Sequence, residues 1–304
     1  MRRMPVETKR KEVIIDEVES GKWIKDGMTI IIGGFLIASH PMAIIRQIIR
    51  NKVRNLTVIG PASSGLEIDF LIAAGCVKKL ISPYVGGETL APIAPCYRIA
   101  AQTGEIEIWE IDEAMYYAGL RAAAQFLPFM PWRGTVGTSY PELNPDIKIF
   151  KDPIKGETLL AVPAIEPDIA ILHAARADCY GNVQHAGTGF GDRAQARAAN
   201  MRIVEVEKIL PNEEIRKDPL RTTVYAAEAI VRAPYGSHPF SSSSFYLEDQ
   251  NHIREYLKAA NIYAKDRDRT ALDEYLERYF YEPKTHADYL ERIGVKRLIS
   301  LYEF

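Results

Sequence analysis

The sequence predicts an α/β protein with an open, mostly parallel sheet, flanking helices and a C-terminal helical extension. Short apolar runs that suit buried strands alternate with segments of helical periodicity. Each of the first three runs ends in a loop of small residues, as expected at the carboxyl edge of such a sheet. From about residue 249 onward the pattern is charged and helical, which divides the chain into residues 1–248 (α/β domain) and 249–304 (extension).

The first third of the chain alternates strands with helices. Residues 7–25 are charged with apolar residues on one helical face, which predicts an amphipathic helix ending before Asp26. Ile30, Ile31 and Ile32 form a continuous apolar run typical of a strand buried on both faces. The expected strands are residues 30–32, 56–59 and 79–83, and the expected helices are residues 41–50 and 66–74.

The remainder repeats this alternation less regularly. Isoleucine and glutamate alternate over residues 106–111 in a fourth strand, after which Asp112 is a plausible N-cap and Glu113 the first helical residue. Prolines exclude a regular helix over residues 127–137. The other expectations are an exposed excursion at 141–158, buried strands at 159–162 and 169–173, a strand at 201–209, an irregular loop at 235–244 and helices beyond.

Composition excludes several classes of protein. Apolar residues make up 47% of the 304 residues, enough for a large core. The net charge of −2 offers no basic excess for a nucleic-acid partner. The longest apolar stretch, residues 28–38, is too short to span a membrane, and the N-terminus lacks the apolar segment of a signal peptide. Three scattered cysteines predict neither disulfides nor a zinc site, so we expect a cytoplasmic protein without a bound metal.

The loops after the first three strands are the candidate substrate-binding site. Ligands of open α/β sheets bind at the carboxyl ends of the strands, and backbone N–H groups there can hold an oxygen that gains charge during a reaction. Ordinary strand-to-helix turns would have the same composition. The candidate residues are Gly33, Gly34, Phe35, Ser63, Ser64, Gly65, Gly86 and Gly87.

Two other motifs carry less weight. Residues 187–191 (GTGFG) imitate a dinucleotide fingerprint but fail its last spacing and lack a long apolar strand before them. His173 has no partners at metal-ligand spacing, so we interpret it as a hydrogen-bonded histidine at a strand end. No permanently bound cofactor is expected.

Glu113 is the candidate catalytic residue. It should lie at the carboxyl edge of the sheet, where a carboxylate can serve as nucleophile or general base. The helix N-terminus favours its ionised form and an apolar crevice would favour the acid. It could equally be a first-turn residue that only complements the helix dipole. Arg133, in the proline-rich loop that follows, is a candidate partner for a substrate carboxylate or for Glu113, or a plain surface arginine.

The stretch DGMTIIIGGFLIASHP (residues 26–41) resembles the signature of the alpha subunits of family I coenzyme A transferases. Ser39 departs from it, because the pattern has glycine there. AAAQFLPFMP, AIEPDIAILHAARADCYGNV, NEEIRKDPLR, APYGSHP and HADYLERIGVKRLISL are similar to stretches of the alpha subunits of glutaconate CoA-transferases. The resemblance covers the chain from about residue 10 to its end.

The resemblance implies a fold shared with ribose-5-phosphate isomerase and a reaction that moves CoA between an acyl-CoA and a carboxylate, possibly a dicarboxylate. It also implies a CoA-transferase beta subunit that carries the nucleophilic glutamate, a site between the two subunits and a heterotetramer or larger assembly. The CoA thioester would be a substrate. The loops at Gly33-Gly34 and Ser63-Ser64 would contact its acyl group.

The stretch EIDEAMYYAGLRAAAQFLPFMPWR is similar to a sister branch, the alpha subunits of ring-cleaving CoA-thioester hydrolases of steroid breakdown. In that branch a glutamate matching Glu113 would open a cyclic β-keto acyl-CoA by retro-Claisen cleavage. The transferase is our first interpretation and this hydrolase our second. A non-catalytic effector-binding domain is a third, disfavoured because the segment before Met28 is too short for a supported helix-turn-helix.

Overall fold

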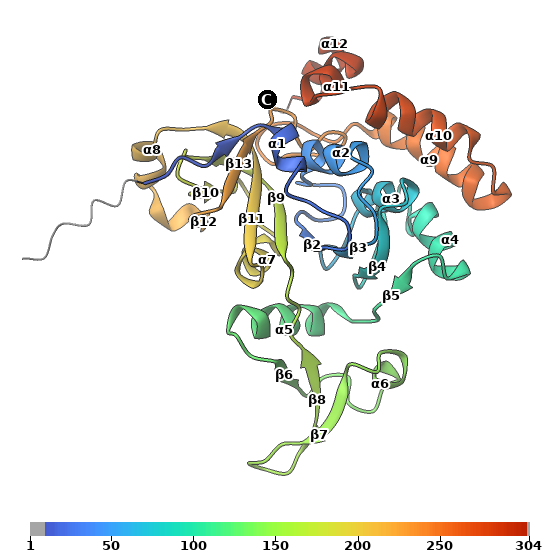
Figure 1. The fold of residues 1–304 in the computed structure, drawn as a ribbon, viewed down its shortest axis with the longest axis vertical. Helices are drawn as coiled ribbons and strands as arrows, with labels where there is room; N and C mark the ends of the chain where they lie inside the picture. The colour runs from blue at the N-terminus through green and yellow to red at the C-terminus, as the bar shows by residue number, and fades with distance from the viewer. Residues whose placement is uncertain (1–9, 303–304) are drawn as a thin grey trace, which may run out of the picture.

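A computed structural model describes residues 10–302 and has a ten-stranded sheet at its centre (Figure 1). Its strands are β1 (Ile14–Ile15), β2 (Thr29–Ile32), β3 (Leu56–Ile59), β4 (Val77–Ile81), β5 (Glu107–Ile108), β9 (Ile169–Ala177), β10 (Val183–Gln184), β11 (Met201–Ile209), β12 (Thr222–Val224) and β13 (Ala229–Arg232). The main path is β1-β13-β11-β9-β2-β3-β4-β5, and every neighbouring pair on it is parallel. β10 joins β9 and β12 antiparallel. The open, mostly parallel sheet is confirmed.

Helices cover both faces of this sheet. They are α1 (Glu17–Gly21), α2 (Met42–Arg50), α3 (Leu66–Ala73), α4 (Pro95–Thr103), α5 (Glu113–Ala124), α7 (Asp192–Ala198) and α8 (Asn212–Arg216), with a 3₁₀ turn η1 (Pro219–Arg221). Ile30 and Ile32 belong to the apolar cluster under α2 and α3, whereas Ile31 belongs to the cluster under α5. All three side chains are fully buried, so β2 is covered on both faces as its apolar run predicts.

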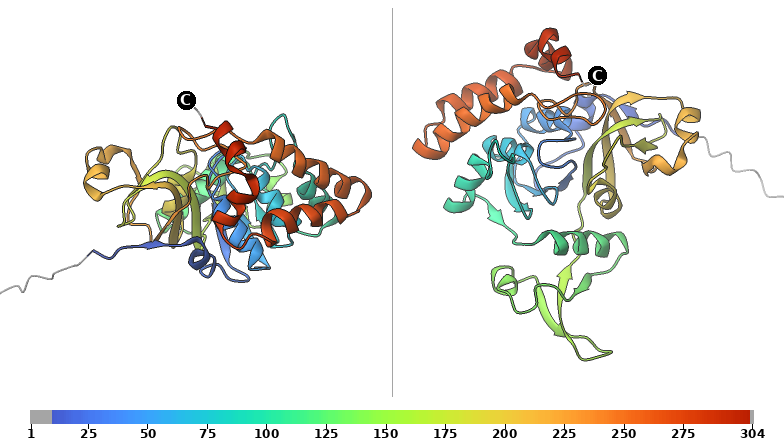
Figure 2. Two further views of the ribbon diagram at one scale, coloured as in Figure 1. Left: turned by 90° about the horizontal axis from the view of Figure 1, so that it is seen from above. Right: turned by 180° about the vertical axis from the view of Figure 1, so that it is seen from behind.

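A second, antiparallel sheet projects from the main one. It contains β6 (Phe129–Trp132), β8 (Thr158–Pro163) and β7 (Lys148–Lys151) in that order, with the short helix α6 (Tyr140–Leu143). Figures 1 and 2 place it beyond α5, at the end of the molecule opposite the C-terminal helices. The expectation that residues 159–162 pair with β9 was therefore wrong, because β8 pairs with β6 and β7 instead. The exposed excursion at 141–158 contains α6 and β7.

Two further expectations were wrong. The described part of residues 7–25 is β1 followed by the five-residue α1, because Ile14 and Ile15 pair with Ile230 and Val231 of β13. Asp16 then starts α1 by accepting a hydrogen bond from the Glu19 N–H at 2.6 Å. Residues 7–9 lie outside the described part. The fourth strand is reduced to β5, since the chain leaves the sheet edge at Trp109.

The C-terminal helices pack on the α/β core. They are α9 (Gln250–Asp266), α10 (Thr270–Leu276), the π-helical turn η2 (Glu277–Tyr281), α11 (His286–Ile293) and α12 (Val295–Ser300). The Tyr256 hydroxyl of α9 donates to Asp69 of α3 at 2.7 Å, and its ring lies 4.3 Å from that of Phe70. We keep the boundary at 248/249 as a proposal, because the helices share one buried apolar cluster with the sheet. Within residues 10–302, no helix is both long and apolar enough to cross a membrane.

Candidate active site

The loops after β2, β3 and β4 meet at the carboxyl edge of the sheet, as their sequence positions predict. The Leu36 N–H donates to the Ser63 carbonyl at 2.9 Å, which joins the first loop to the second. The Ser64 N–H donates to the Tyr84 carbonyl at 3.1 Å, and the Gly86 N–H donates to the Ser64 carbonyl at 3.0 Å. The candidate residues of all three loops therefore form one continuous structure.

Glycine is required in the first of these loops. Gly34 has a φ of 103°, and a Cβ there would lie 2.5 Å from His40 Nδ1. A Cβ on Gly33 would lie 2.8 Å from Leu172 and 2.9 Å from the Asp192 carboxylate. Ser39 has a φ of 60°, in the left-handed region that glycine adopts without strain. This explains why the family pattern has glycine at that position.

The amides of this loop do not form an open oxyanion hole. The Gly33 N–H continues the sheet by donating to the Ile171 carbonyl at 2.9 Å. The Gly34 N–H donates to Asp192 Oδ1 at 3.0 Å, and this carboxylate is fully buried. The expectation that these amides directly hold a thioester oxygen is thus not met in this structure, because the chain's own groups occupy them.

Asp192 begins a chain of buried hydrogen bonds. Its Oδ2 lies 2.9 Å from His185 Nε2, and His185 Nδ1 lies 2.6 Å from Thr223 Oγ1. A carboxylate at one ring nitrogen and a hydroxyl at the other fix the orientation of the imidazole. This chain links the Gly34 amide to Thr223, which lines a large cavity. Sequence reasoning missed Asp192 and His185, although residues 187–191 lead directly to Asp192. These glycines follow the antiparallel β10 and do not form a dinucleotide-binding turn.

A second buried pair supports the loop after β2 from below. His40 Nδ1 and Nε2 lie 2.9 Å from the Gly33 carbonyl oxygen and 3.0 Å from that of Leu36, respectively. Glu67 Oε2 lies 3.2 Å from His40 Nε2, and its Oε1 accepts from the Gly65 N–H. Burial lowers the pKa of His40 to about 4 and raises that of Glu67 to about 8. The pair is neutral overall whichever partner holds the proton, so it braces the loop without adding charge.

His173 is a structural histidine, as its surroundings in the sequence predict. Its Nδ1 lies 3.0 Å from Glu205 Oε1 and its Nε2 lies 2.9 Å from Ser242 Oγ. Burial opposes the charged ring, but the hydrogen bond with Glu205 and the nearby charge of Glu207 raise the pKa of His173. β9 extends to Ala177, so the residue lies within the strand and not at its end.

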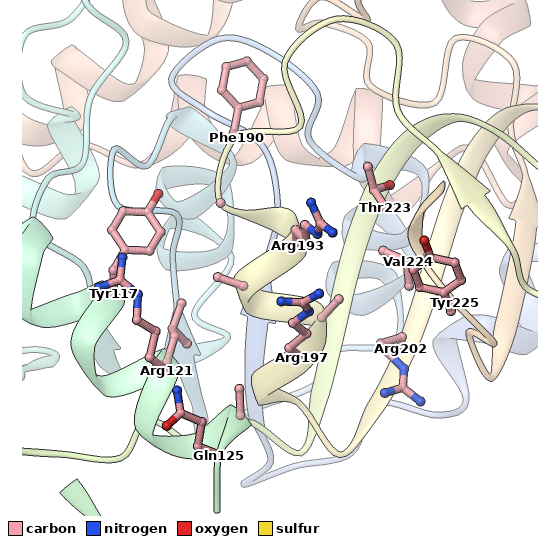
Figure 3. A pocket seen from close by; sticks show the side chains of 15 residues that line it. Tyr117, Arg121, Gln125, Phe190, Arg193, Arg197, Arg202, Thr223, Val224 and Tyr225 are labelled. Atoms are coloured by element: carbon pink, nitrogen blue, oxygen red, sulfur yellow. The ribbon is translucent and has the colours of Figure 1, made fainter. Parts of the chain in front are cut away.

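A cavity of about 820 Å³ lies beside this network, between α5 and α7 (Figure 3). Phe190 lines it and stacks on Phe35, with ring centroids 5.0 Å apart and planes at 6°. Phe35 directly follows Gly34, so the cavity begins where the loop after β2 ends. Among residues 10–302, no three histidine, cysteine or acidic side chains are grouped to hold a metal ion.

The family model of coenzyme A transferase matches residues 18–233. The corresponding subunit of glutaconate CoA-transferase from Acidaminococcus fermentans is 30% identical over 298 residues, covering 92% of this chain and 91% of the relative. The chain belongs to the coenzyme A transferase family. The crystal structure of that glutaconate CoA-transferase superposes with a TM-score of 0.88 at 29% identity, covering 96% of both chains.

Two more relatives define its place among the CoA transferases. An uncharacterized protein of Archaeoglobus fulgidus is 39% identical over 283 residues, and the chain spans 62% of that relative's length. The cholesterol ring-cleaving hydrolase IpdA subunit of Mycobacterium tuberculosis is 35% identical over 249 residues, covering 78% of this chain and 85% of the relative. The resemblance to both branches of this family is thus confirmed.

The two charged residues predicted for the site lie apart. Asp112 Oδ1 caps α5 by accepting from the Met115 N–H at 2.7 Å, which makes Glu113 the first helical residue, as expected. Glu113 is exposed, and the described residues offer it no ion-pair partner. Arg133 is also exposed, but it lies in the projecting sheet and pairs with Glu157. Its expected pairing with Glu113 is not observed in this transferase-family chain.

Proposed function

We propose that this chain is the alpha subunit of a two-subunit CoA-transferase that moves CoA between an acyl-CoA and a carboxylate, possibly a dicarboxylate such as glutaconate. The observation that carries this proposal is the near full-length match, in sequence and structure, to one of the two kinds of subunit of a glutaconate CoA-transferase. The three joined loops at the carboxyl edge of the sheet support it, because ligands of such sheets bind there.

The structure suggests how the loops would act. Ser64 and the glycines of the three loops are buried and hydrogen-bonded within the chain, whereas Phe35 and Ser63 remain half-buried at the surface. We therefore assign the loops the task of forming a rigid wall against which Phe35 and Ser63 contact the acyl group. The nucleophilic glutamate would come from a beta subunit, in a heterotetramer or larger assembly.

A transfer assay on the reconstituted enzyme tests this proposal. The chain is purified by itself and together with a co-expressed beta-type subunit, and CoA transfer from acetyl-CoA to a panel of carboxylates is followed. We expect turnover only by the complex. Turnover by the purified single chain would contradict a site shared between subunits, and hydrolysis without transfer by the complex would contradict the transferase.

The ring-opening hydrolase remains a second candidate because of Glu113. This exposed carboxylate starts α5 one turn before Tyr117, and the IpdA subunit is similar over most of this chain. Loss of a general base costs about 10²- to 10⁴-fold in rate. If the Glu113→Gln complex loses less than about tenfold, roughly 1.4 kcal/mol of barrier, the hydrolase proposal fails. The matched control is Glu110→Gln, an exposed glutamate three residues earlier.

We also propose a cytoplasmic location. Cys76, Cys96 and Cys179 are all free, and the first two are buried. Free thiols are typical of reducing compartments. Intact-mass analysis after thiol alkylation of protein taken directly from cells would test it, since three alkylated cysteines are expected.

A further inference from the structure

The cavity between α5 and α7 is lined by four arginines. Arg193 and Arg197 lie one helical turn apart on α7, Arg121 lies near the end of α5 and Arg202 lies on β11. Figure 3 shows Arg193 and Arg197 between α5, with Tyr117 and Arg121, and the segment that carries Thr223 and Tyr225. The cavity volume of about 820 Å³ is that of a site for a large small-molecule ligand.

Three of these arginines have no acidic partner within the described part of the chain. Arg202 is held by Glu228, whose Oε2 accepts from Nε at 3.0 Å. Across residues 10–302, no carboxylate lies within 4.0 Å of the guanidinium nitrogens of Arg121, Arg193 or Arg197. Like charges one turn apart on a helix destabilise it by a few tenths of a kcal/mol. This cluster of cations is therefore unfavourable in the free protein, and a bound anion would relieve it.

Aromatic rings flank the same cavity. Tyr117 lies on α5 beside Arg121, and Phe190 stacks on Phe35 at the entrance from the glycine loop. Tyr225 is 57% exposed although it is a large ring. Exposed aromatic faces next to arginines are suited to stacking a nucleobase whose phosphates the guanidinium groups bind.

We propose that this cavity binds the nucleotide end of a CoA thioester, with Arg121, Arg193 and Arg197 on its phosphates. This inference rests on the proposed function, because it takes the substrate to be a CoA thioester. Three unpaired cations match the several charges of a phosphorylated nucleotide, whereas the single carboxylate of an acyl group needs one bidentate arginine. The continuity from the cavity through Phe190 to Phe35 then directs the thioester toward the loop after β2.

Calorimetric titration of the full chain with adenosine 3′,5′-bisphosphate tests the inference directly. We expect saturable binding to the unmodified chain and at least tenfold weaker binding to the Arg193→Gln/Arg197→Gln variant. Arg216→Gln is the matched control, because Arg216 is an exposed helical arginine on α8, away from the cavity. It should bind as the unmodified chain does. Absence of binding by the unmodified chain, or equal binding by the double variant, would overturn the inference.

The assays separate this inference from the proposed function. Nucleotide binding needs neither an acyl donor nor a partner, so arginine-dependent binding without any transfer would reject the transferase and keep the site. Transfer with an unchanged KM for acetyl-CoA in the double variant would reject the site and keep the transferase. If the double variant no longer associates with the beta subunit but binds the nucleotide unchanged, the arginines serve the interface between subunits, which would also overturn the inference.

Discussion

His286 provides a test of the structure through the pH dependence of stability. It begins α11 with its ring buried, Nδ1 lying 3.1 Å from Arg46 Nη2 and Nε2 lying 2.8 Å from the Pro234 carbonyl oxygen. A guanidinium only donates hydrogen bonds and a carbonyl only accepts them, so the neutral ring with its proton on Nε2 satisfies both. Burial, and then the charge of Arg46, lower the pKa of His286 to about 3.

The sign of the effect follows from proton linkage. A histidine in the unfolded chain has a pKa of about 6.5. Between pH 6.5 and 3 the unfolded chain therefore binds a proton that folded His286 does not, and the free energy of unfolding falls as the pH falls. The loss attributable to this ring between pH 7 and pH 5 is about 2 kcal/mol.

The His286→Gln variant removes the titration and keeps the contacts, because the glutamine carbonyl can accept from Arg46 while its amide donates to Pro234. Urea unfolding is followed by circular dichroism at pH 7 and pH 5. We expect the variant to lose about 2 kcal/mol less than the unmodified chain between these pH values. Other buried histidines, such as His40, contribute equally to both proteins. Losses that agree within about 0.5 kcal/mol would refute the account of His286.

Two predictions concern the loop after β2. A Cβ at position 65 would lie 1.7 Å from the Leu36 carbonyl oxygen, so Gly65→Ala should lower the free energy of unfolding by about 3 kcal/mol. Gly189→Ala is the control, since its Cβ meets nothing closer than 3.5 Å, and equal melting temperatures would contradict the prediction. In a double-mutant cycle, Phe35→Ala and Phe190→Ala should show a coupling of about 0.5–1.5 kcal/mol in denaturant unfolding. Additive losses would show that the stacked rings do not stabilise each other.

The elements predicted correctly from sequence are those with a strong local pattern. The isoleucines of β2 are buried on both faces, which a continuous apolar run requires. The Asp112 cap likewise depends only on the residues beside it. β1 was missed because its pairing partner lies at Ile230, and no local pattern reveals a partner so far along the chain. Propensity favours a helix there, whereas tertiary pairing makes a strand.

The candidate site divides along the same line. The three loops converge because parallel strands end at one edge, which topology alone predicts. That Asp192 holds the Gly34 amide was not predictable, since these residues are 158 positions apart and one partner is a backbone group. Arg133 could not be placed either, because it reaches Glu157 through an antiparallel sheet, and the sequence there predicts only a buried strand and an exposed excursion.

The strand order also constrains how the chain assembles during synthesis. β2 lies between β3, which follows it closely, and β9, which begins at Ile169. Until that later strand emerges from the ribosome, β2 exposes one unpaired edge of an apolar strand, a template for wrong association. Parallel pairing between such distant segments is also slow. Slower, cooler expression should therefore raise the yield of correctly assembled chain, because it gives this open edge time to find β9 before it finds another molecule.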